Sequence, residues 1–508
     1  MTKFPGAAAI ACIIAISACA ARPAPPTQPT QPAQLLVSDL DRLFSTPPFD
    51  TALWSVRIER MRDGRLLYER NARTLVMPAS NMKIVTMAAA AEMLGWDYRF
   101  ETRLAARGEI RDGVLHGDLI AIGGGDPSIA SVDFGASPLF TAWARELRAA
   151  GVSRVTGRVI GDDSAFDDEG IGAGWAWDYL AYGYAAPVSA LQYSESVAVL
   201  RIRPGTREGE AATVVASPPG HGLDIRAAVQ TTAATTTASI DLARLPGQNA
   251  LTVTGRVPAN GRQVIRTAAV DNPTLFFAAG LRDALMAAGI RVDGAAMDID
   301  QVDGYVVSAQ DRLLAMHRSA PLSELGAYFM KVSQNVYGET FLKAMGRTAG
   351  GGAGSLATGR AVVRGLLEKW GIAPGTYAIF DGSGLSRYNE ISAALVVTVL
   401  RRMHEDEKHR GWFMAALPVA GQDGTLDQRM IGTELARAVQ AKTGTISNAR
   451  SLSGFLTAPD GERFVFSIIA NNFQRPSAEV DAIAEGALKR VLREASLPST
   501  PAPRQPSR

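Results

Sequence analysis

Two hairpin patterns lie near the two ends of the chain. Residues 53–60 and 65–70 are strand-like segments that flank Asp63-Gly64, a dipeptide favoured in tight β-turns. Residues 453–458 and 463–469 flank Asp460-Gly461 in the same way, and the pattern of residues 481–494 predicts a closing helix. Strands at both ends of the chain, with helices between them, predict one sheet that both termini build.

Helical periodicity follows the first hairpin. Over residues 77–95 the apolar side chains at 82, 85, 87, 88 and 93 can form one face, and Gly95 is a typical helix end. Residues 322–345 and 357–370 also show a helical pattern, whereas residues 438–441 are typical of a strand. The two ends of the chain therefore predict a mixture of helices and strands.

The long middle of the chain has a different texture. Residues 101–295 consist of short strand-like runs rich in glycine, threonine and alanine, and a helical pattern is evident only at 275–288. We therefore expect an α/β catalytic domain, an antiparallel sheet with helices, made from residues 36–100 and 296–495. A β-rich insertion at 101–295 interrupts it and can itself be nested, with an inner piece at about 187–255.

Composition adds little to this picture. Of the 508 residues, 47% are hydrophobic and 20% are charged, which is an ordinary globular composition. A chain of this length is too long for one compact core, so we expect two or three domains. A net charge of +2, with no basic stripe, gives no indication of nucleic-acid binding. The five histidines show no spacing typical of metal ligands, so we expect neither a metal nor an organic cofactor. The charged stretch 404–409 is typical of a solvated helix face.

The first 19 residues form a targeting segment. An apolar run at 4–18, too short to span a bilayer comfortably, leads into Ser17-Ala18-Cys19, which resembles a bacterial lipobox. In that pattern Cys19 becomes the lipidated first residue and anchors the protein to a membrane, with Ala20 favouring the outer membrane. The alternative is cleavage after Ala20, which leaves a soluble protein. Both alternatives predict export to the periplasm.

The segments that follow and close the chain are biased in composition. Residues 20–35 form a Pro/Gln-rich linker, and residues 496–508 form a similar tail, so we expect both to be extended and disordered. The only other cysteine, Cys12, lies within the targeting segment. The mature chain is therefore expected to contain no disulfide and no catalytic thiol.

Three short motifs follow one another in the chain: Ser80-Asn81-Met82-Lys83, Ser333-Gln334-Asn335 and Lys442-Thr443-Gly444-Thr445. On a helix, residues three apart share a face, so the Lys83 amine can reach the Ser80 hydroxyl and accept its proton. The second motif falls in the helical pattern 322–345, and the third follows a strand. Gly444 leaves room for a substrate at the strand edge, and Lys442 places a cation near the serine.

Lysine is rare in this chain, which makes the first motif more specific. Of 52 basic residues only eight are lysines, and Ser80 is the only serine that stands three positions before any of them. The ordered set Ser-x-x-Lys, Ser-x-Asn and Lys-Thr-Gly is the signature of penicillin-binding proteins and serine β-lactamases. Three unrelated surface motifs would be a poor explanation of that order.

The chain resembles the low-molecular-mass penicillin-binding proteins that are D-alanyl-D-alanine carboxypeptidases and endopeptidases with a large insertion after the active-site helix. The resemblance covers most of residues 36–495 and implies a penicillin-binding, β-lactamase-like transpeptidase domain. Besides the three motifs, it includes four blocks typical of the family: 123–127, 381–387, 417–426 and Ser453-Gly454.

The resemblance implies the chemistry. Ser80 attacks the penultimate D-Ala carbonyl of a peptidoglycan peptide, with Lys83 as base, and β-lactam antibiotics acylate the same serine. The N–H groups of Ser80 and Thr445 form the oxyanion hole. The resemblance also implies that Ser333 and Lys442 pass a proton to the leaving amine. It implies that Asn335 binds the substrate amide, and that the hydroxyls of Thr443 and Thr445 bind the terminal carboxylate.

Two charged residues are candidates for binding the substrate side chain. A diaminopimelate side chain carries an amine and a carboxylate, which Asp178 and Arg387 would complement. The alternative is that both are ordinary surface charges. The family's asparagines are missing around Gln192-Tyr193-Ser194-Glu195-Ser196, a block remote in sequence from the three motifs, which puts detail of the insertion in doubt more than catalysis.

Two other functions stay open. A serine β-lactamase shares the acylation chemistry, although the long insertion and the lack of an evident deacylating glutamate motif count against it. A wall-binding lipoprotein without activity could have the same fold. The simplest sign of such a protein would be the loss of Ser80 or Lys83, and this chain retains both residues. The favoured function is a serine-type DD-carboxypeptidase with DD-endopeptidase activity.

Overall fold

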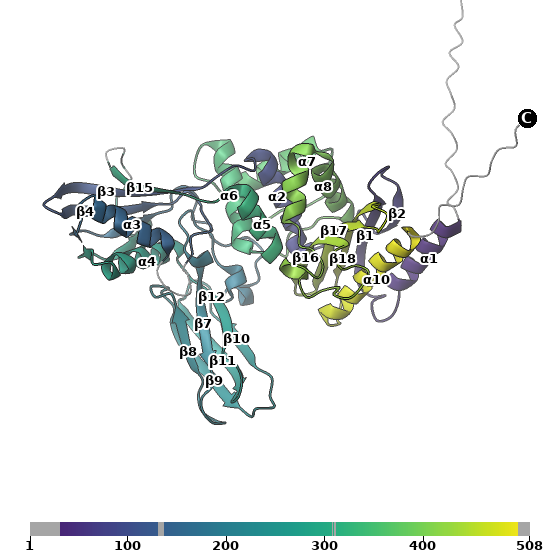
Figure 1. The fold of residues 1–508 in the computed structure, drawn as a ribbon, viewed down its shortest axis with the longest axis horizontal. Coiled ribbons are helices and arrows are strands. Elements are labelled where there is room, and N and C mark those ends of the chain that lie inside the picture. The colour runs from purple at the N-terminus through teal and green to yellow at the C-terminus, as the bar shows by residue number, and fades with distance from the viewer. Residues whose placement is uncertain (1–30, 131–136, 307, 309–310, 496–508) are drawn as a thin grey trace, which may run out of the picture.

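The computed structural model describes residues 31–130, 137–306, 308 and 311–495. The targeting segment with Cys19 and Ala20, most of the expected linker, and the tail 496–508 lie outside the described residues. Figure 1 shows a helix-rich body that contains both ends of the described chain, a lobe beside it, and a narrow arm that extends away from both. No helix within the described ranges is long and apolar enough to cross a membrane.

One antiparallel sheet in the body joins the two ends of the chain, as the hairpin patterns predict. Its strand order is β16-β17-β18-β1-β2. Strand β1 pairs with β18 over its whole length, from Leu53 opposite Asn471 to Arg60 opposite Phe464. The strands are β1 (Leu53–Arg60), β2 (Leu66–Arg70), β16 (Val439–Ile446), β17 (Ala449–Thr457) and β18 (Arg463–Asn471).

Helices cover both faces of this sheet. Helices α1 (Gln31–Phe44) and α10 (Ser477–Ala495) pack together on one face, and α8 (Ala393–Glu405) lies on the other. The expected extended linker 20–35 is wrong at its C-terminal end, because α1 begins at Gln31. Leu36, Leu40 and Phe44 recur at helical spacing and are buried in the core beneath α10, so tertiary burial stabilises a helix that the Pro/Gln composition disfavours.

Helix α2 (Met82–Met93) is the centre of the helical part of the body. It contacts α5 (Leu322–Val332), α6 (Asn335–Gly350), α7 (Leu356–Lys369) and α8, while α9 (Glu407–Ala416) packs on α5 and α8. The expected single apolar face is wrong, because every residue from Met82 to Ala91 is buried. Alanines on the remaining faces allow neighbouring helices to approach α2 from all sides.

The expected helix over 322–345 is in fact two helices. Helix α5 ends at Val332, and α6 starts at Asn335. Between them Ser333 adopts a left-handed backbone conformation with φ of 65°, which a non-glycine residue rarely adopts. The second motif therefore lies in a turn between helices and not on a helix face.

The lobe is a seven-stranded sheet with two helices on it. Its main path is β13-β5-β4-β3-β15, and β6 adds to β4 and β14 to β6. Strand β15 pairs with β3, so this sheet continues to Arg318, past the expected boundary at 295. The strands are β3 (Glu101–Arg111), β4 (Val114–Ile122), β5 (Arg154–Val155), β6 (Val159–Asp162), β13 (Arg291–Val292), β14 (Ala296–Asp298) and β15 (Arg312–Arg318).

The two helices of the lobe are α3 (Pro138–Ala149) and α4 (Pro273–Ala287). The helical pattern at 275–288 predicts α4, but α3 is not expected from the sequence. Phe140, Trp143 and Leu147 form its buried stripe, and the Ser137 side chain caps its first turn by accepting from the Leu139 N–H. The insertion is therefore a mixed α/β unit and not only β-rich.

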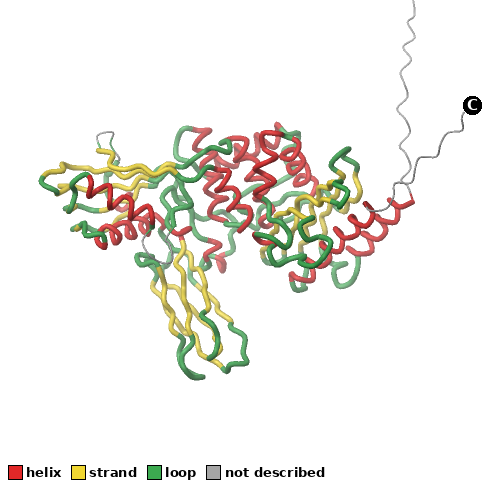
Figure 2. Tube along the Cα trace, in the orientation of Figure 1, coloured by secondary structure: helices red, strands yellow, loops and turns green. Residues whose placement is uncertain are grey.

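The arm consists of strands and loops, as Figure 2 shows. Two three-stranded sheets, β12-β7-β8 and β10-β11-β9, share one apolar core. The first and last residues of the arm lie side by side, because the Val270 N–H donates to the Ser196 carbonyl at 2.9 Å. The strands are β7 (Val197–Arg203), β8 (Thr213–Ser217), β9 (Asp224–Thr232), β10 (Ser239–Ala243), β11 (Ala250–Pro258) and β12 (Val264–Ala269). They span 197–269, a segment shifted C-terminally from the expected inner piece at 187–255.

Candidate active site

Ser80 lies in a one-turn 3-10 helix, Ala79–Asn81, that leads into α2. Ala79 has a left-handed φ of 48°, so this turn is strained and depends on its neighbours. The buried Asn81 amide donates to the Lys442 carbonyl on β16 at 2.9 Å, and the Ser451 hydroxyl on β17 donates to the Pro78 carbonyl at 2.7 Å. The sheet thereby holds the first motif against the third.

The Lys83 amine is fully buried and has three oxygen partners. Its Nζ lies 2.9 Å from Ser80 Oγ, 2.6 Å from Asn335 Oδ1 and 2.7 Å from the Ser383 carbonyl oxygen. The two carbonyl oxygens can only accept hydrogen bonds. A neutral amine, with two N–H bonds and one lone pair, therefore satisfies both carbonyls and presents its lone pair to the Ser80 hydroxyl.

Burial supports the neutral form of this amine. It lowers the pKa of Lys83 from 10.5 to about 7, against the opposing effect of the carboxylates of Asp381 and Glu339. An amine with that pKa can accept a proton near neutral pH, which is what activation of a serine hydroxyl requires.

Lys442 lies on β16 with its amine also fully buried. Its Nζ contacts Ser333 Oγ at 2.8 Å and the Thr443 carbonyl oxygen at 2.9 Å. Burial and then the charge of Lys83 lower the pKa of Lys442 well below its usual value. Since two buried cations disfavour each other, one of the two amines gives up its proton first. Burial and mutual repulsion therefore favour at most one charge on this pair of amines.

Gly444 permits the close approach of β16 to the nucleophile turn. A Cβ atom at this position would lie 2.8 Å from the Pro78 carbonyl oxygen, 3.0 Å from the Ser80 nitrogen and 2.2 Å from Ser451 Oγ. We expect a glycine here to make room for substrate. The structure adds a different reason, which is that the glycine lets the backbone of the strand contact the backbone of the nucleophile.

A cleft of about 540 Å³ opens beside Ser80. Ser333, Asn335, Thr443 and Thr445 line it together with Ser80, so all three motifs reach one cavity. The other lining residues come from five segments: Tyr179, Tyr184, Gly384, Leu385, Thr425, Ile446, Ser447, Asn448, Phe473 and Ser477.

Several of these cleft residues are not predicted as site residues. Thr425 accepts a hydrogen bond from the Thr443 hydroxyl at 2.7 Å, and the Tyr184 carbonyl accepts from Asn335 Nδ2 at 2.7 Å. Arg450, which lies opposite Thr445 on β17, donates to the Thr445 hydroxyl. Thr425 belongs to the family block 417–426, but the sequence contains no signal that marks Tyr184 or Arg450.

Two buried carboxylates behind Lys83 are also missed by the sequence motifs. Glu339 on α6 accepts from the N–H groups of Gly382 and Ser383 at 2.9 Å each, and Asp381 accepts from the Gly384 N–H at 2.8 Å. Burial, and next the charge of Asp381, raises the pKa of Glu339 to about 8. Together these carboxylates hold the loop that presents the Ser383 carbonyl to Lys83. Block 381–387 contains Asp381, but its role requires the structure.

Asp178 and Arg387 lie beside residues that line the rim of the cleft. Arg387 donates to the carbonyl of Ser447, a lining residue, at 2.9 Å. Asp178 is exposed in a 3-10 turn next to Tyr179, whose hydroxyl donates to Ser447 Oγ at 2.8 Å. Among the described residues no hydrogen bond or ion pair joins Asp178 to Arg387, so the two residues approach the same rim from separate segments.

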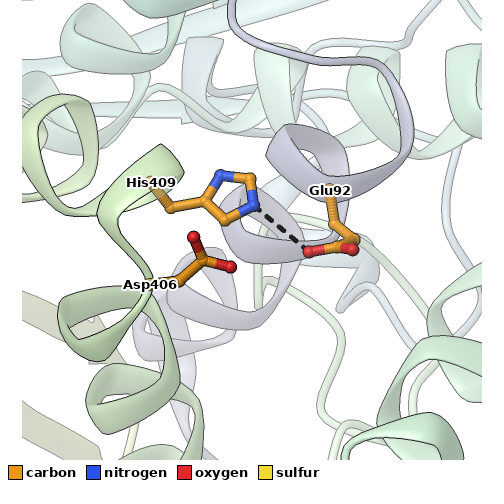
Figure 3. A group of neighbouring side chains, drawn as sticks. All are labelled: Glu92, Asp406 and His409. Atoms are coloured by element: carbon orange, nitrogen blue, oxygen red, sulfur yellow. Dashed lines mark hydrogen bonds and ion pairs between the residues drawn. The ribbon is translucent and has the colours of Figure 1, made fainter.

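Two clusters in the described ranges bring together side chains of the kinds that bind metal ions. In the first, Trp96 Nε1 donates to His409 Nδ1 at 3.1 Å, so the neutral imidazole carries its proton on Nε2 and donates to Glu92 at 3.2 Å (Figure 3). Asp406 caps α9 through the Lys408 N–H. The buried imidazole therefore has no free lone pair, and His409 is not part of a solvated face as its charged segment predicts.

The second cluster consists of Asp163, Asp298 and Asp300 in the lobe. Two of these carboxylates already have protein donors, because Asp163 accepts from the Ser189 hydroxyl at 2.9 Å and Asp298 accepts from the Asn272 amide at 2.6 Å. Burial raises the pKa of Asp163 to about 6. This cluster lies in the lobe and is remote in the chain from the three motifs.

Fold and site together define a class. A serine next to a buried lysine, a second serine next to another buried lysine, and a strand edge with Lys-Thr-Gly are the features of penicillin-binding serine enzymes. Residues 36–492 match the family model described as "D-Ala-D-Ala carboxypeptidase 3 (S13) family", and the chain belongs to this family. It is a serine-type D-alanyl-D-alanine carboxypeptidase.

Individual relatives agree with this assignment. A D-alanyl-D-alanine carboxypeptidase of an Actinomadura species is 35% identical over 88% of this chain and 84% of its own. The DacB carboxypeptidase of Haemophilus influenzae is 27% identical over 83% of this chain and 86% of its own. The crystal structure of penicillin binding protein 4 from Haemophilus influenzae superposes with a TM-score of 0.77 at 25% identity, covering 90% of this chain and 99% of that one.

The contact at Gly444 can be tested by adding one methyl group. Gly444→Ala places a Cβ atom against backbone atoms of Pro78 and Ser80, which cannot rotate away. A displacement of about 1 Å at a nucleophile lowers rates by roughly 100-fold, so we expect a loss of that size in the rate of acylation by a fluorescent penicillin. Gly411→Ala is the matched control, because its Cβ would meet nothing within 4 Å on α9. Equal acylation by both variants would contradict the role of the contact.

Proposed function

We propose that the protein hydrolyses the D-Ala-D-Ala bond of peptidoglycan stem peptides through an acyl-enzyme on Ser80, and that it also cleaves D-Ala cross-links. The observation that carries this proposal is the set of partners around the Lys83 amine. Burial favours a neutral amine 2.9 Å from the Ser80 hydroxyl, and two carbonyl oxygens accept the two N–H groups of that amine. Lys83 Nζ accepts the Ser80 proton while Oγ bonds to the carbonyl carbon of the penultimate D-Ala.

The other motif residues complete the reaction. The N–H groups of Ser80 and Thr445 stabilise the oxyanion. Support for this proposal comes from Gly444, the neighbour of Thr445: a Cβ atom added there would lie only 3.0 Å from the Ser80 nitrogen, so the two backbone segments are close together. Ser333, bonded to Lys442 at 2.8 Å, passes a proton to the leaving amine as the peptide bond breaks. The proton that Lys83 took from Ser80 replaces it, so Lys83 is again neutral. Water then attacks the acyl-enzyme ester, which releases the shortened peptide and restores the Ser80 hydroxyl.

Substrate is held at the edge of β16. Lys442 and the Thr445 hydroxyl bind the terminal carboxylate, and Arg450 behind Thr445 leaves that hydroxyl's hydrogen free to point into the cleft. The Thr443 hydroxyl also binds the carboxylate, in exchange for its present bond to Thr425. Asn335 binds the substrate amide in exchange for its present contact with the Tyr184 carbonyl. The solved Haemophilus influenzae relative has also been determined with a novel β-lactam bound, and we propose that β-lactams acylate Ser80 here.

Asp178 and Arg387 bind the polar end of the substrate side chain in this proposal. Arg387 bonds to Ser447 and Asp178 precedes Tyr179, and both Ser447 and Tyr179 line the cleft. The opposite charges of Asp178 and Arg387 complement an amine and a carboxylate on one side chain. Exposure of Asp178 keeps its carboxylate available to a ligand.

The cellular location is also a proposal. We infer that the protein works in the periplasm and is anchored through a lipid on Cys19, with the outer membrane favoured by Ala20. The lipobox-like residues that end the targeting segment support this inference.

Muropeptide analysis tests the proposed reaction. Purified protein should remove one D-alanine from pentapeptide monomers and convert D-Ala-linked dimers to monomers, whereas Ser80→Ala should do neither, as mass spectrometry would detect. Substrates that lack the ionic end of the third side chain should be cleaved more slowly, and Asp178→Ala or Arg387→Ala should abolish that preference. A parent protein that leaves both muropeptides intact would overturn the proposal, and rapid turnover of penicillin instead would identify a β-lactamase.

The rate of acylation should rise with pH through about 7. Because the pKa of Lys83 is lowered to about 7, its amine becomes a neutral base above that pH and stays charged below it. We expect the second-order rate constant for a fluorescent penicillin to increase from about pH 5 to about pH 8. Lys83→Arg keeps its charge at every pH and should show no measurable acylation. A flat profile in the parent would mean that Lys83 is not the base.

Cell fractionation tests the lipid anchor. The parent protein should remain in the membrane fraction and incorporate labelled fatty acid, and Cys19→Ala should incorporate none. A parent protein that is recovered without label in the soluble periplasmic fraction would favour cleavage after Ala20 instead.

A further inference from the structure

We propose that Glu195, in the inserted segment, is a positioning residue that holds the turn of Ser333 and Asn335 in its catalytic geometry. The inference rests on the proposed roles of these two residues. It concerns the block 192–196 of the insertion. That block is remote from the three motifs in sequence, but the structure places it directly against the second motif.

Gln334, the middle residue of the second motif, is held at both ends of its side-chain amide. Its Oε1 accepts from the Asn335 N–H at 2.7 Å and caps α6, and its Nε2 donates to the Glu195 carboxylate. The first bond fixes which end of the amide faces Glu195. The carboxylate therefore determines the side-chain position of the residue between Ser333 and Asn335.

The second oxygen of Glu195 reaches the preceding helix. It accepts from the Tyr328 hydroxyl on α5 at 2.6 Å, and the Tyr328 ring lies 5.1 Å from the Tyr337 ring on α6. One carboxylate thus bridges the two helices on either side of Ser333. An acceptor-only group with two oxygens suits this position, because both of its partners are donors.

The turn needs such a support. Ser333 has a φ of 65°, a left-handed conformation that a residue with a Cβ keeps only when its surroundings impose it. Besides the bond between Lys442 and Ser333, the bridge through Glu195 is a polar contact that restrains both flanks of this turn. Relaxation of the turn would move the Ser333 hydroxyl away from Lys442 and the Asn335 carbonyl away from Lys83.

The backbone around Glu195 is also strained. Ser194, Glu195 and Ser196 have φ values of 49°, 55° and 58°, three consecutive left-handed residues without a glycine. Both ends of the block are fixed within the insertion, since the Ser194 N–H donates to the Ile129 carbonyl at 2.8 Å and the Ser196 carbonyl accepts from the Val270 N–H at 2.9 Å. Consecutive strained residues that aim one side chain at a catalytic turn are a typical mark of function.

Further contacts join the insertion to α6 near this block. The Gln192 amide donates to the Thr340 hydroxyl at 2.9 Å, and the buried Lys343 amine contacts the Asp167 carboxylate at 2.6 Å. These contacts join the insertion to the same helix but lie one and two turns beyond the motif. They offer a control that weakens the interface without touching the turn.

Kinetics of a D-Ala-D-Ala peptide and of a penicillin test the proposal. Glu195→Ala should lower both kcat and the acylation rate by roughly 10- to 100-fold. Glu195→Gln should recover most of this loss, because its carbonyl can accept from Gln334 while its amide donates to the Tyr328 hydroxyl oxygen. Thr340→Val, which removes the Gln192 contact, should lower the melting temperature but leave kcat close to that of the parent.

A double-mutant cycle distinguishes positioning from general support. If Glu195 acts through Gln334, then Glu195→Ala combined with Gln334→Ala should be no slower than the slower single variant. Additive losses, or parental kcat in Glu195→Ala, would overturn the inference while the activity of the parent upholds the proposed function. A parent without peptidase activity but with normal penicillin acylation would refute the proposed function and still allow the positioning role to be measured.

Discussion

The site depends on one constraint, the complete burial of the Lys83 amine. A fully buried ammonium is costly, so the amine is driven towards its neutral form. The carboxylates of Asp381 and Glu339 oppose this effect, and burial outweighs them. Because Glu339 is itself buried beside Asp381, the pKa of Glu339 rises and its share of negative charge falls. Desolvation therefore decides the protonation state on which activation of Ser80 depends.

The burial of Lys83 requires precise backbone positions around it. Strained turns provide these positions, and neighbouring backbone segments pack closely against them. Ala79 and Ser333 both have left-handed backbones, and neither is a glycine. Glycines stand instead on the opposing surfaces: a Cβ at Gly384 would lie 1.9 Å from the Ala79 carbonyl oxygen, and one at Gly444 would meet the Ser80 nitrogen. The strained turn at Ala79 therefore packs against two backbone segments that have no side chain at the contact.

The insertion takes part in the site and is more than an appended domain. Tyr184 binds Asn335 through its carbonyl and lines the cleft, Tyr179 bonds to Ser447 at the rim, and Glu195 contacts the middle of the second motif. Trp175 adds a hydrogen bond of 2.9 Å to the buried Asp381. The chain therefore assembles its catalytic centre from segments on both sides of the insertion and from the insertion itself.

The sequence alone determined the three motifs, the terminal hairpins and the sheet that joins both ends, because each rests on local spacing and turn chemistry. Ser80 with Lys83, and Lys442 with Gly444, lie within a few residues of each other, so local geometry already relates them. The tertiary structure alone decided the break at Ser333, the helix at Gln31, the buried His409 and the roles of Glu339, Asp381 and Glu195. Each of these depends on burial or on a partner more than a hundred residues away, and the desolvation that sets the pKa of Lys83 has no counterpart in a local pattern.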